Sequence, residues 1–121
     1  MLDNHSTLSE AKALIIQTTT PTIELAKLIA EKLVRESLAA CVNLSAPSLS
    51  IYSWKDTLHS DEEYTLTIKT STARQADCIA RIQELHSYDV PEIIVLPIIG
   101  GSKQYLQWIA DETRWIKPKT T

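Results

Sequence analysis

The pattern of apolar and polar residues predicts an alternation of strands and helices along the chain. Residues 11–18 contain three consecutive apolar side chains, which is typical of a strand that is covered on both faces. Residues 21–37 carry apolar side chains at helical spacing, namely Ala26, Ile29, Ala30 and Leu33. Thr20 and Pro21 stand where an N-cap and a first helical residue are expected. The first two elements are therefore a strand and an amphipathic helix.

Residues 38–54 predict one long strand that bends in its middle. Pro47 interrupts this strand and has no N–H group to donate, so we expect a bulge or an edge position there. A turn over residues 56–62 follows. Apolar and polar side chains then alternate over residues 64–69, as they do in a strand with one buried face. The two strands together predict a hairpin.

Two more helices and one more strand follow the hairpin. We expect a helix that ends near His86, a strand over residues 93–96 and a third, amphipathic helix within residues 102–113. Residues 1–10 are polar and unpatterned, so we expect them to be frayed and flexible. The chain length suits one domain, which spans residues 1–121 in this interpretation.

The order strand, helix, strand, strand, helix, strand predicts a ferredoxin-like α+β sandwich, a βαββαβ unit with two helices on one face of its sheet. The third helix is an addition at the C-terminal end. This topology leaves the second and fourth strands at the sheet edges, and the fourth is apolar on both faces. Ile51, Tyr52 and Trp54 add an apolar cluster on the second strand. Such edges need a partner, so we expect a homo-oligomer that assembles through its strands.

Composition and charge exclude several classes of function. The net charge is −3, from 12 basic and 15 acidic residues, which disfavours binding to nucleic acid. No apolar run reaches the ~18 residues of a membrane span, and the first residues lack a secretory signal pattern. Cys41 and Cys78 have no paired spacing, so we expect reduced, buried thiols and a cytoplasmic protein. The sequence contains no recognisable catalytic motif, so we expect no enzyme activity.

The stretch from His86 to Pro97 contains the candidate metal ligands. His86 could bind a divalent metal ion through a neutral ring nitrogen, with Glu92 or Asp89 as a second donor. The alternative is that His86 packs on the helix or satisfies a carbonyl group at the helix C-terminus.

Three more residues are candidates for a cleft between subunits. Tyr88 flanks the turn into the last strand. Lys69 ends the third strand, where it could meet an acidic residue of a neighbouring subunit or lie in solvent. Trp54 is either interface packing or part of a binding platform. Small ligands favour clefts of this kind.

Several motifs, taken in order, resemble those of one family. They are T-T-P at the first helix, L-A-A-C-V-N and S-I-Y-S-W-K on the second strand, E-Y-T-L-T-I-K-T on the third, Y-D-V-P-E-I-I-V-L-P after the second helix and Y-L-Q-W-I near the end. They cover roughly residues 12–113 and resemble the divalent-cation tolerance proteins called CutA. The resemblance implies a ferredoxin-like subunit, similar to the nitrogen-regulatory PII proteins, in a homotrimer. It also implies a link to tolerance of copper and other divalent cations, without an established catalytic activity.

The resemblance implies a copper ligand set of one cysteine and two histidines. The matching positions here hold Thr18, Leu85 and His86, so only His86 is a residue of the expected type. Asp56 also stands where the family commonly has a glycine after the tryptophan, which bears on the geometry of the turn.

We therefore expect a cytoplasmic homotrimer that takes part in tolerance of copper or another divalent cation. It would bind the ion weakly, at His86 and Glu92, and would require no cofactor. The alternative is a PII-like sensor or scaffold. In that case a small metabolite or a partner protein would bind in a cleft between subunits, lined by Trp54, Lys69 and Tyr88.

Overall fold

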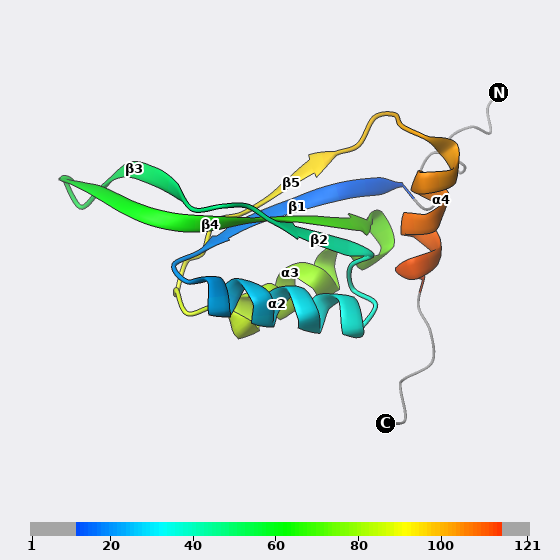
Figure 1. Ribbon diagram of the computed structural model, residues 1–121, viewed down its shortest axis with the longest axis horizontal. Helices are drawn as coiled ribbons and strands as arrows, with labels where there is room; N and C mark the ends of the chain where they lie inside the picture. Colours follow the sequence, from blue (N-terminus) through cyan, green and yellow to red (C-terminus); the bar gives the residue numbers. More distant parts are fainter. Residues whose placement is uncertain (1–11, 115–121) are drawn as a thin grey trace.

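Five strands form one antiparallel sheet, and two helices lie on one of its faces (Figure 1). The computed structural model describes residues 12–114, so the predicted fraying of residues 1–10 lies outside the described residues. The strands are β1 (Ala13–Thr20), β2 (Cys41–Leu44), β3 (Ser48–Trp54), β4 (Thr57–Ser71) and β5 (Ile93–Pro97). The helices are α2 (Ile23–Arg35), α3 (Gln75–Leu85) and α4 (Lys103–Glu112), with a 3-10 turn over Thr72–Arg74 before α3.

The strands follow the order β2-β4-β1-β5, and β3 pairs with the first half of β4. All of these neighbours are antiparallel. The predicted α+β class, the order of elements and the edge positions of β2 and β5 are thereby confirmed. Helix α4 lies at one end of the sheet, and the β3–β4 hairpin projects from the other end (Figure 1).

The main hydrophobic core lies between the sheet and helices α2 and α3. Alternate residues of β1, Leu14 and Ile16, contribute to it from the sheet. Ile29 and Leu33 come from α2, and Ile82 comes from α3; all three side chains are fully buried. Each buried side chain of this size stabilises the fold by about 1.5–3 kcal/mol. The helical spacing of apolar residues in α2 therefore predicted its buried face correctly.

Helix α2 begins later than the sequence indicates. Thr22 is its N-cap, because its side-chain oxygen accepts a hydrogen bond from the backbone N–H of Leu25 at 3.2 Å. Thr20 is still the last residue of β1, and its hydroxyl donates to the Thr22 carbonyl oxygen at 2.9 Å. The prediction that Thr20 caps the helix was wrong, since Pro21 lies in the bend before the helix rather than in its first turn.

A β-bulge at Pro47 separates β2 from β3, as its missing N–H group predicted. Leu44 pairs with Leu66, and the next pair is Ser48 with Glu63. Three residues on this strand therefore face two on β4, and the extra residue is the bulge. A bulge bends its strand and increases the local twist. The hairpin that begins at Ser48 thus leaves the plane of the sheet.

The turn between β3 and β4 is shorter than predicted. Only Lys55 and Asp56 lie between the paired residues Trp54 and Thr57, so the predicted turn over residues 56–62 was wrong. Lys55 and Asp56 have φ angles of 51° and 64°, as a tight two-residue hairpin turn requires. Asp tolerates this left-handed conformation better than most residues, which explains how Asp56 can stand at a turn position that favours glycine. Strand β4 is consequently 15 residues long.

Helix α4 closes the end of the sheet but leaves edge strand β5 open. Ile109 of α4 is fully buried in a second small core beside Ala13 and Ala40. On β5, the side chains of Ile94 and Leu96 remain 46% and 41% exposed.

Within residues 12–114, no helix combines the length and the apolar character needed to cross a membrane.

Both cysteines are free thiols. Cys78 is fully buried on α3, as predicted, and this burial raises its pKa to about 12. Cys41 is only half-buried, with its sulfur 4.0 Å from the side-chain oxygen of Asn43. The prediction of a buried Cys41 was wrong because β2 is an edge strand.

Candidate functional site

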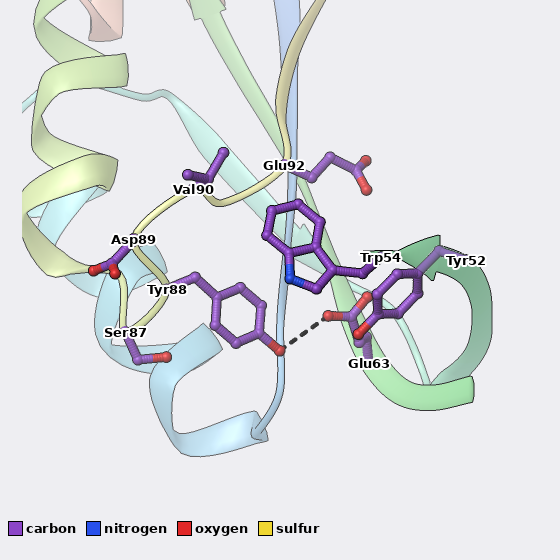
Figure 2. Close-up of a pocket in the computed structure, with 8 residues that line it drawn as sticks. All are labelled: Tyr52, Trp54, Glu63, Ser87, Tyr88, Asp89, Val90 and Glu92. Atoms are coloured by element: carbon purple, nitrogen blue, oxygen red, sulfur yellow. Dashed lines mark hydrogen bonds between the residues drawn. The ribbon is translucent and has the colours of Figure 1, made fainter. Parts of the chain in front are cut away.

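A pocket of about 590 Å³ opens where the loop after α3 meets the β3–β4 hairpin (Figure 2). Its lining residues are Tyr52, Trp54 and Glu63 from the hairpin and Ser87, Tyr88, Asp89, Val90 and Glu92 from the loop. Three aromatic rings and three carboxylates therefore share one cavity, and none of these eight residues is basic. The position of the pocket follows from the bulge and the tight turn. Together they place the β3–β4 hairpin beside the loop of residues 87–92.

A hydrogen bond between Tyr88 and Glu63 connects the two halves of the pocket. The Tyr88 hydroxyl donates to a carboxylate oxygen of Glu63 at 3.2 Å (Figure 2). Partial burial, and then the negative charge of Glu63, raise the pKa of Tyr88 to about 12. The phenol is therefore neutral near neutral pH and acts as a hydrogen-bond donor.

The other polar groups around the pocket are also anchored. The Tyr52 hydroxyl donates to a carboxylate oxygen of Asp61, and this hydrogen bond is the main reason why the pKa of Tyr52 is raised. The Gln17 side-chain amide of β1 donates to one oxygen of Glu92 at 3.0 Å. Nearby negative charge adds to both raised pKa values, after burial for Tyr88 and after the Asp61 hydrogen bond for Tyr52, because it disfavours a phenolate.

One positive charge does lie beside the pocket. The Lys55 ammonium group, at the tip of the hairpin, lies 6.0 Å from the ring centroid of Trp54. This distance is at the limit of a cation–π contact. Trp54 itself is 56% exposed, and its indole projects from the hairpin toward the loop (Figure 2).

His86 lies behind the pocket and holds the loop in place. Its Nε2 is 2.7 Å from the Thr19 carbonyl oxygen, and its Nδ1 accepts a hydrogen bond from the backbone N–H of Tyr88 at 3.1 Å. A carbonyl oxygen can only accept, so the ring is the neutral tautomer with its proton on Nε2. The His86 and Tyr88 rings are 4.9 Å apart. To bind a metal ion, His86 would have to give up one of these hydrogen bonds, and its role as a ligand stays a prediction.

Lys69 lies outside the pocket. It is near the end of β4, whereas the pocket is beside the beginning of this strand. Its ammonium group donates to the Tyr105 hydroxyl at 3.4 Å and lies 5.6 Å from the centroid of that ring. Lys69 therefore belongs to the surface shared by the sheet and α4 within one subunit.

The structure brings together Trp54, Tyr88, Asp89 and Glu92, four of the six residues that the sequence singled out. Sequence reasoning named Tyr52 only as part of the apolar cluster with Trp54, and it missed Glu63. The sequence did contain a signal for these positions. Tyr52 and Trp54 are two residues apart, as are Asp61 and Glu63, which is the spacing of side chains on one face of a strand. With a two-residue turn these four side chains fall on one face of the hairpin, because Tyr52 is opposite His59 and Ser48 is opposite Glu63.

The pocket is suited to bind a cation. Glu63, Asp89 and Glu92 line this partly apolar cavity, and the carboxylates of Asp89 and Glu92 point to opposite sides of it (Figure 2). Within residues 12–114, however, no three His, Cys, Asp or Glu side chains lie close enough together to hold one metal ion. A bare ion would therefore receive at most two ligands from side chains of these four types, which favours weak binding.

By its fold the chain belongs to the class of small α+β proteins, and a long hairpin borders its acidic, aromatic cavity. A family model described as CutA1 divalent ion tolerance protein matches residues 14–112. The chain belongs to the CutA1 divalent ion tolerance protein family. This description names ion tolerance and no reaction, and the sequence resemblance to the family is confirmed.

Individual relatives agree with this assignment. Protein CutA, chloroplastic, from Arabidopsis thaliana is 40% identical over 102 residues, which are 84% of this chain and 56% of that protein, so the match spans about half of that relative. The divalent-cation tolerance protein CutA from Thermus thermophilus is 41% identical over 82% of this chain and 96% of its own length. The crystal structure of CutA1 from Oryza sativa has a TM-score of 0.84 at 36% identity, covering 88% of this chain and 97% of that one.

Proposed function

We propose that this protein takes part in tolerance of divalent cations and binds such ions weakly in its acidic pocket, without catalysis. The observation that carries the proposal is the gathering of Glu63, Asp89 and Glu92 around one cavity in a member of this family. Glu92 is the first candidate ligand, because only one of its oxygens is held by Gln17. The second candidate is His86, which lies directly behind Tyr88.

The two candidate ligands favour different ions. Carboxylate oxygens suit hard cations such as Mg²⁺ and Mn²⁺, whereas imidazole nitrogen suits copper. Binding of Mn²⁺ through Glu92 requires no change in the His86 hydrogen bonds. Binding of Cu²⁺ through His86 requires the ring to release Tyr88 or Thr19.

Calorimetric titration of Mn²⁺ and Cu²⁺ into four proteins tests the proposal. The proteins are the wild type, Glu92→Gln, His86→Ala and the charge-matched control Glu24→Gln, which alters an exposed residue of α2. We expect Glu92→Gln to weaken binding of both ions about tenfold, as loss of a ligand does, and Glu24→Gln to change nothing. A weaker response to Cu²⁺ alone is expected for His86→Ala. Identical curves for wild type and Glu92→Gln would overturn the metal site, and identical curves for His86→Ala would remove His86 from it.

We also propose that the protein is a homotrimer that assembles through its strands. Leu49, Ile51 and Leu58 share the hairpin face opposite the pocket and are 64%, 64% and 75% exposed. The edge strand β5 adds exposed Ile94 and Leu96. Apolar surface of this extent on an edge and on a projecting hairpin is costly in a monomer.

Light scattering on the purified protein measures the assembly directly. We expect a mass three times the 13.6 kDa of one chain. Ile51→Asp should lower this mass, because it buries a charge in the proposed interface. Val34→Asp is the matched control, since Val34 is also an exposed apolar residue but lies on helix α2. A mass of 13.6 kDa for the wild type at micromolar concentration would exclude the trimer.

A second function is favoured by the size of the pocket. A cavity of about 590 Å³ lies within the range of small-molecule sites, and Trp54 and Tyr88 give it aromatic walls. This supports a PII-like sensor or scaffold that binds a metabolite or a partner protein, the alternative drawn from the sequence. A thermal-shift screen of metabolites and nucleotides separates the two functions, because only a sensor gains stability from a ligand that is not a metal ion.

We propose a cytoplasmic location as well. The support is that Cys41 and Cys78 are both free thiols, as is usual in a reducing compartment. The names of relatives point to other compartments, since the Arabidopsis protein is called chloroplastic and a structure from Archaeoglobus fulgidus is called periplasmic. Fractionation of cells that express the chain decides the question, and recovery in a membrane-enclosed compartment would overturn this proposal.

A further inference from the structure

The pocket has features that a bare metal ion does not use. Its volume of about 590 Å³ is enough for a ligand of many atoms. Trp54 and Tyr88 are 56% and 38% exposed, so part of each aromatic ring is open to a ligand. Val90, which is 80% exposed, adds an aliphatic group beside them. Aromatic and aliphatic walls stabilise an organic ligand and contribute nothing to a hydrated ion.

The carboxylates of the pocket still have unused acceptor capacity. Among residues 12–114, Glu63 accepts one hydrogen bond through a single oxygen, from Tyr88, and Glu92 accepts one in the same way from Gln17. The second oxygen of each carboxylate is therefore available to another donor. Asp89 lines the same cavity and takes part in no ion pair within the described part of the chain. Carboxylate oxygens of this kind form their strongest hydrogen bonds with N–H donors that carry positive charge.

We propose that the pocket binds the primary ammonium group of a small organic cation, with the carboxylates of Glu63 and Glu92 as hydrogen-bond acceptors and the Trp54 ring against the ligand. A primary ammonium group has three N–H donors, which suits a site that offers more than one free carboxylate oxygen. Its alkyl chain would lie along Trp54 and Val90. This inference rests on the second proposed function, a pocket for a small organic ligand, and specifies the chemistry of that ligand; it does not depend on metal binding, although the two share a pocket.

The hairpin tip already contains a contact of the proposed kind, between an ammonium group and the Trp54 ring. The Lys55 ammonium group is itself a primary alkylammonium ion, and it lies 6.0 Å from the Trp54 ring centroid. Lys55 also carries the charge that a bound ligand would face at close range. Removal of this charge should therefore strengthen binding, whereas removal of a pocket carboxylate should weaken it. The two opposite effects distinguish a specific site from general attraction to an acidic protein.

The first experiment compares three probes by NMR titration of the tryptophan indole and backbone N–H signals, in phosphate buffer near neutral pH. The probes are butylammonium chloride, the neutral isostere butan-1-ol and butyltrimethylammonium chloride, which has no N–H donor. We expect saturable binding of butylammonium with a dissociation constant of about 1 mM, as suits a ligand of so few atoms. The other two probes should bind at least about fivefold more weakly, because one lacks the charge and the other the donors. Equal binding of either, or no saturation by butylammonium at about 50 mM, would overturn the proposal.

The second experiment repeats the butylammonium titration with three variants. Glu63→Gln keeps an acceptor oxygen for Tyr88 but removes the charge, and we expect about tenfold weaker binding. Lys55→Met should bind about threefold more tightly. The control Glu24→Gln changes the net charge by the same amount at an exposed site on α2 and should bind as the wild type does. Equal affinities of Glu63→Gln and Glu24→Gln would overturn the site, and unchanged thermal melting would show that Glu63→Gln is folded.

A competition arm separates this inference from metal binding. Mn²⁺ is added to the complex with butylammonium, and both affinities are measured. Binding of Mn²⁺ without any binding of butylammonium overturns the organic-cation site and leaves the proposed function intact. Binding of butylammonium without binding of Mn²⁺ supports the organic-cation site and overturns the metal site in this pocket.

Discussion

Two regions of the molecule use the same kinds of residues in opposite ways. The body, residues 12–44 and 64–114, contains the main hydrophobic core between the sheet and the helices, although the apolar side chains of its edge strand β5 stay exposed. The arm, residues 48–63, presents its large apolar side chains to solvent. Ile16 in the body is fully buried, whereas Ile51 in the arm is 64% exposed. Both lie in strands with alternating side chains, so the difference comes from what covers the strand and not from the strand itself.

This difference assigns separate roles to the two regions. The body has its own core and is stabilised by it. Among residues 12–114 no helix covers the arm, which leaves its apolar face open to the proposed second chain and its other face open to the proposed ligand. The pocket lies where the two regions meet, with Tyr88 from the body joined to Glu63 from the arm. Substitutions that act on one region and spare the other can test this division.

The largest effect is expected from a matched pair of isoleucines. Ile82→Ala, in the core beneath the sheet, should lower the free energy of unfolding by about 3 kcal/mol, because it removes buried groups and leaves a cavity. Ile51→Ala should change the stability of the subunit by less than about 0.5 kcal/mol. Urea denaturation at two protein concentrations measures both. Its concentration dependence separates subunit folding from assembly.

The opposite result would break the comparison. If Ile51→Ala destabilises the subunit as strongly as Ile82→Ala at low protein concentration, the arm is an integral part of the core. The body would then not be stable without the arm.

The body was the more predictable region because its elements are periodic and their burial follows the period. Ala26, Ile29 and Leu33 recur at helical spacing, and all three are fully buried. The arm was less predictable, since its conformation depends on a turn. Asp56 gives a weaker turn signal than the glycine usual at such positions, and the polar run after it looks like a loop rather than a strand.

The error in the turn also limited the prediction of the site. Trp54, Tyr88 and Glu92 were chosen as candidates and do line the pocket. Glu63 could not be chosen, because its place beside them depends on the pairing of β3 with β4. Lys69 was chosen because it lies near the end of a strand. The spacing of residues along one strand does not reveal which other elements pack against each end of that strand. Such contacts between distant segments require the fold.

A smaller effect is expected from two buried threonines of the body. The Thr18 hydroxyl is buried and has no hydrogen-bond partner within the described residues. Thr18→Val should therefore stabilise the protein by about 1 kcal/mol, since it removes an unpaired polar group at nearly constant shape. The Thr70 hydroxyl is equally buried, but it donates to the Leu38 carbonyl oxygen at 2.7 Å. Thr70→Val should destabilise by about 1–2 kcal/mol. Thermal unfolding measures both, and effects of the same sign would contradict this assignment.

The contact between body and arm should make stability depend on pH in the alkaline range. The pKa of Tyr88 is about 12 in the folded protein, against about 10 for an unfolded tyrosine, because burial and Glu63 disfavour the phenolate. The folded pKa is the higher one, so the stabilisation is complete below pH ~10 and is lost as the pH rises toward ~12. Tyr88 is 38% exposed, so solvent screening reduces the expected loss to about 1 kcal/mol.

Denaturation of wild type and Tyr88→Phe at several alkaline pH values isolates this contribution. The difference in stability between the two proteins should shrink as the pH rises, because the phenylalanine has no proton to lose. The remaining tyrosines are present in both proteins and cancel. A constant difference across this range would mean that Tyr88 does not report the junction between body and arm.

The smallest effect is expected at the tip of the arm, and it sharpens the comparison most. Lys55 and Asp56 both have positive φ angles, which Asn and Gly adopt at lower cost. Lys55→Asn combined with Asp56→Gly should stabilise the hairpin by about 0.5 kcal/mol. If the arm opens without the body, amide hydrogen exchange should slow in residues 48–63 alone, while the free energy of global unfolding stays the same. An equal gain in global stability would show that arm and body unfold as one unit, since a stabilised hairpin raises the global value only when it remains folded until the core opens.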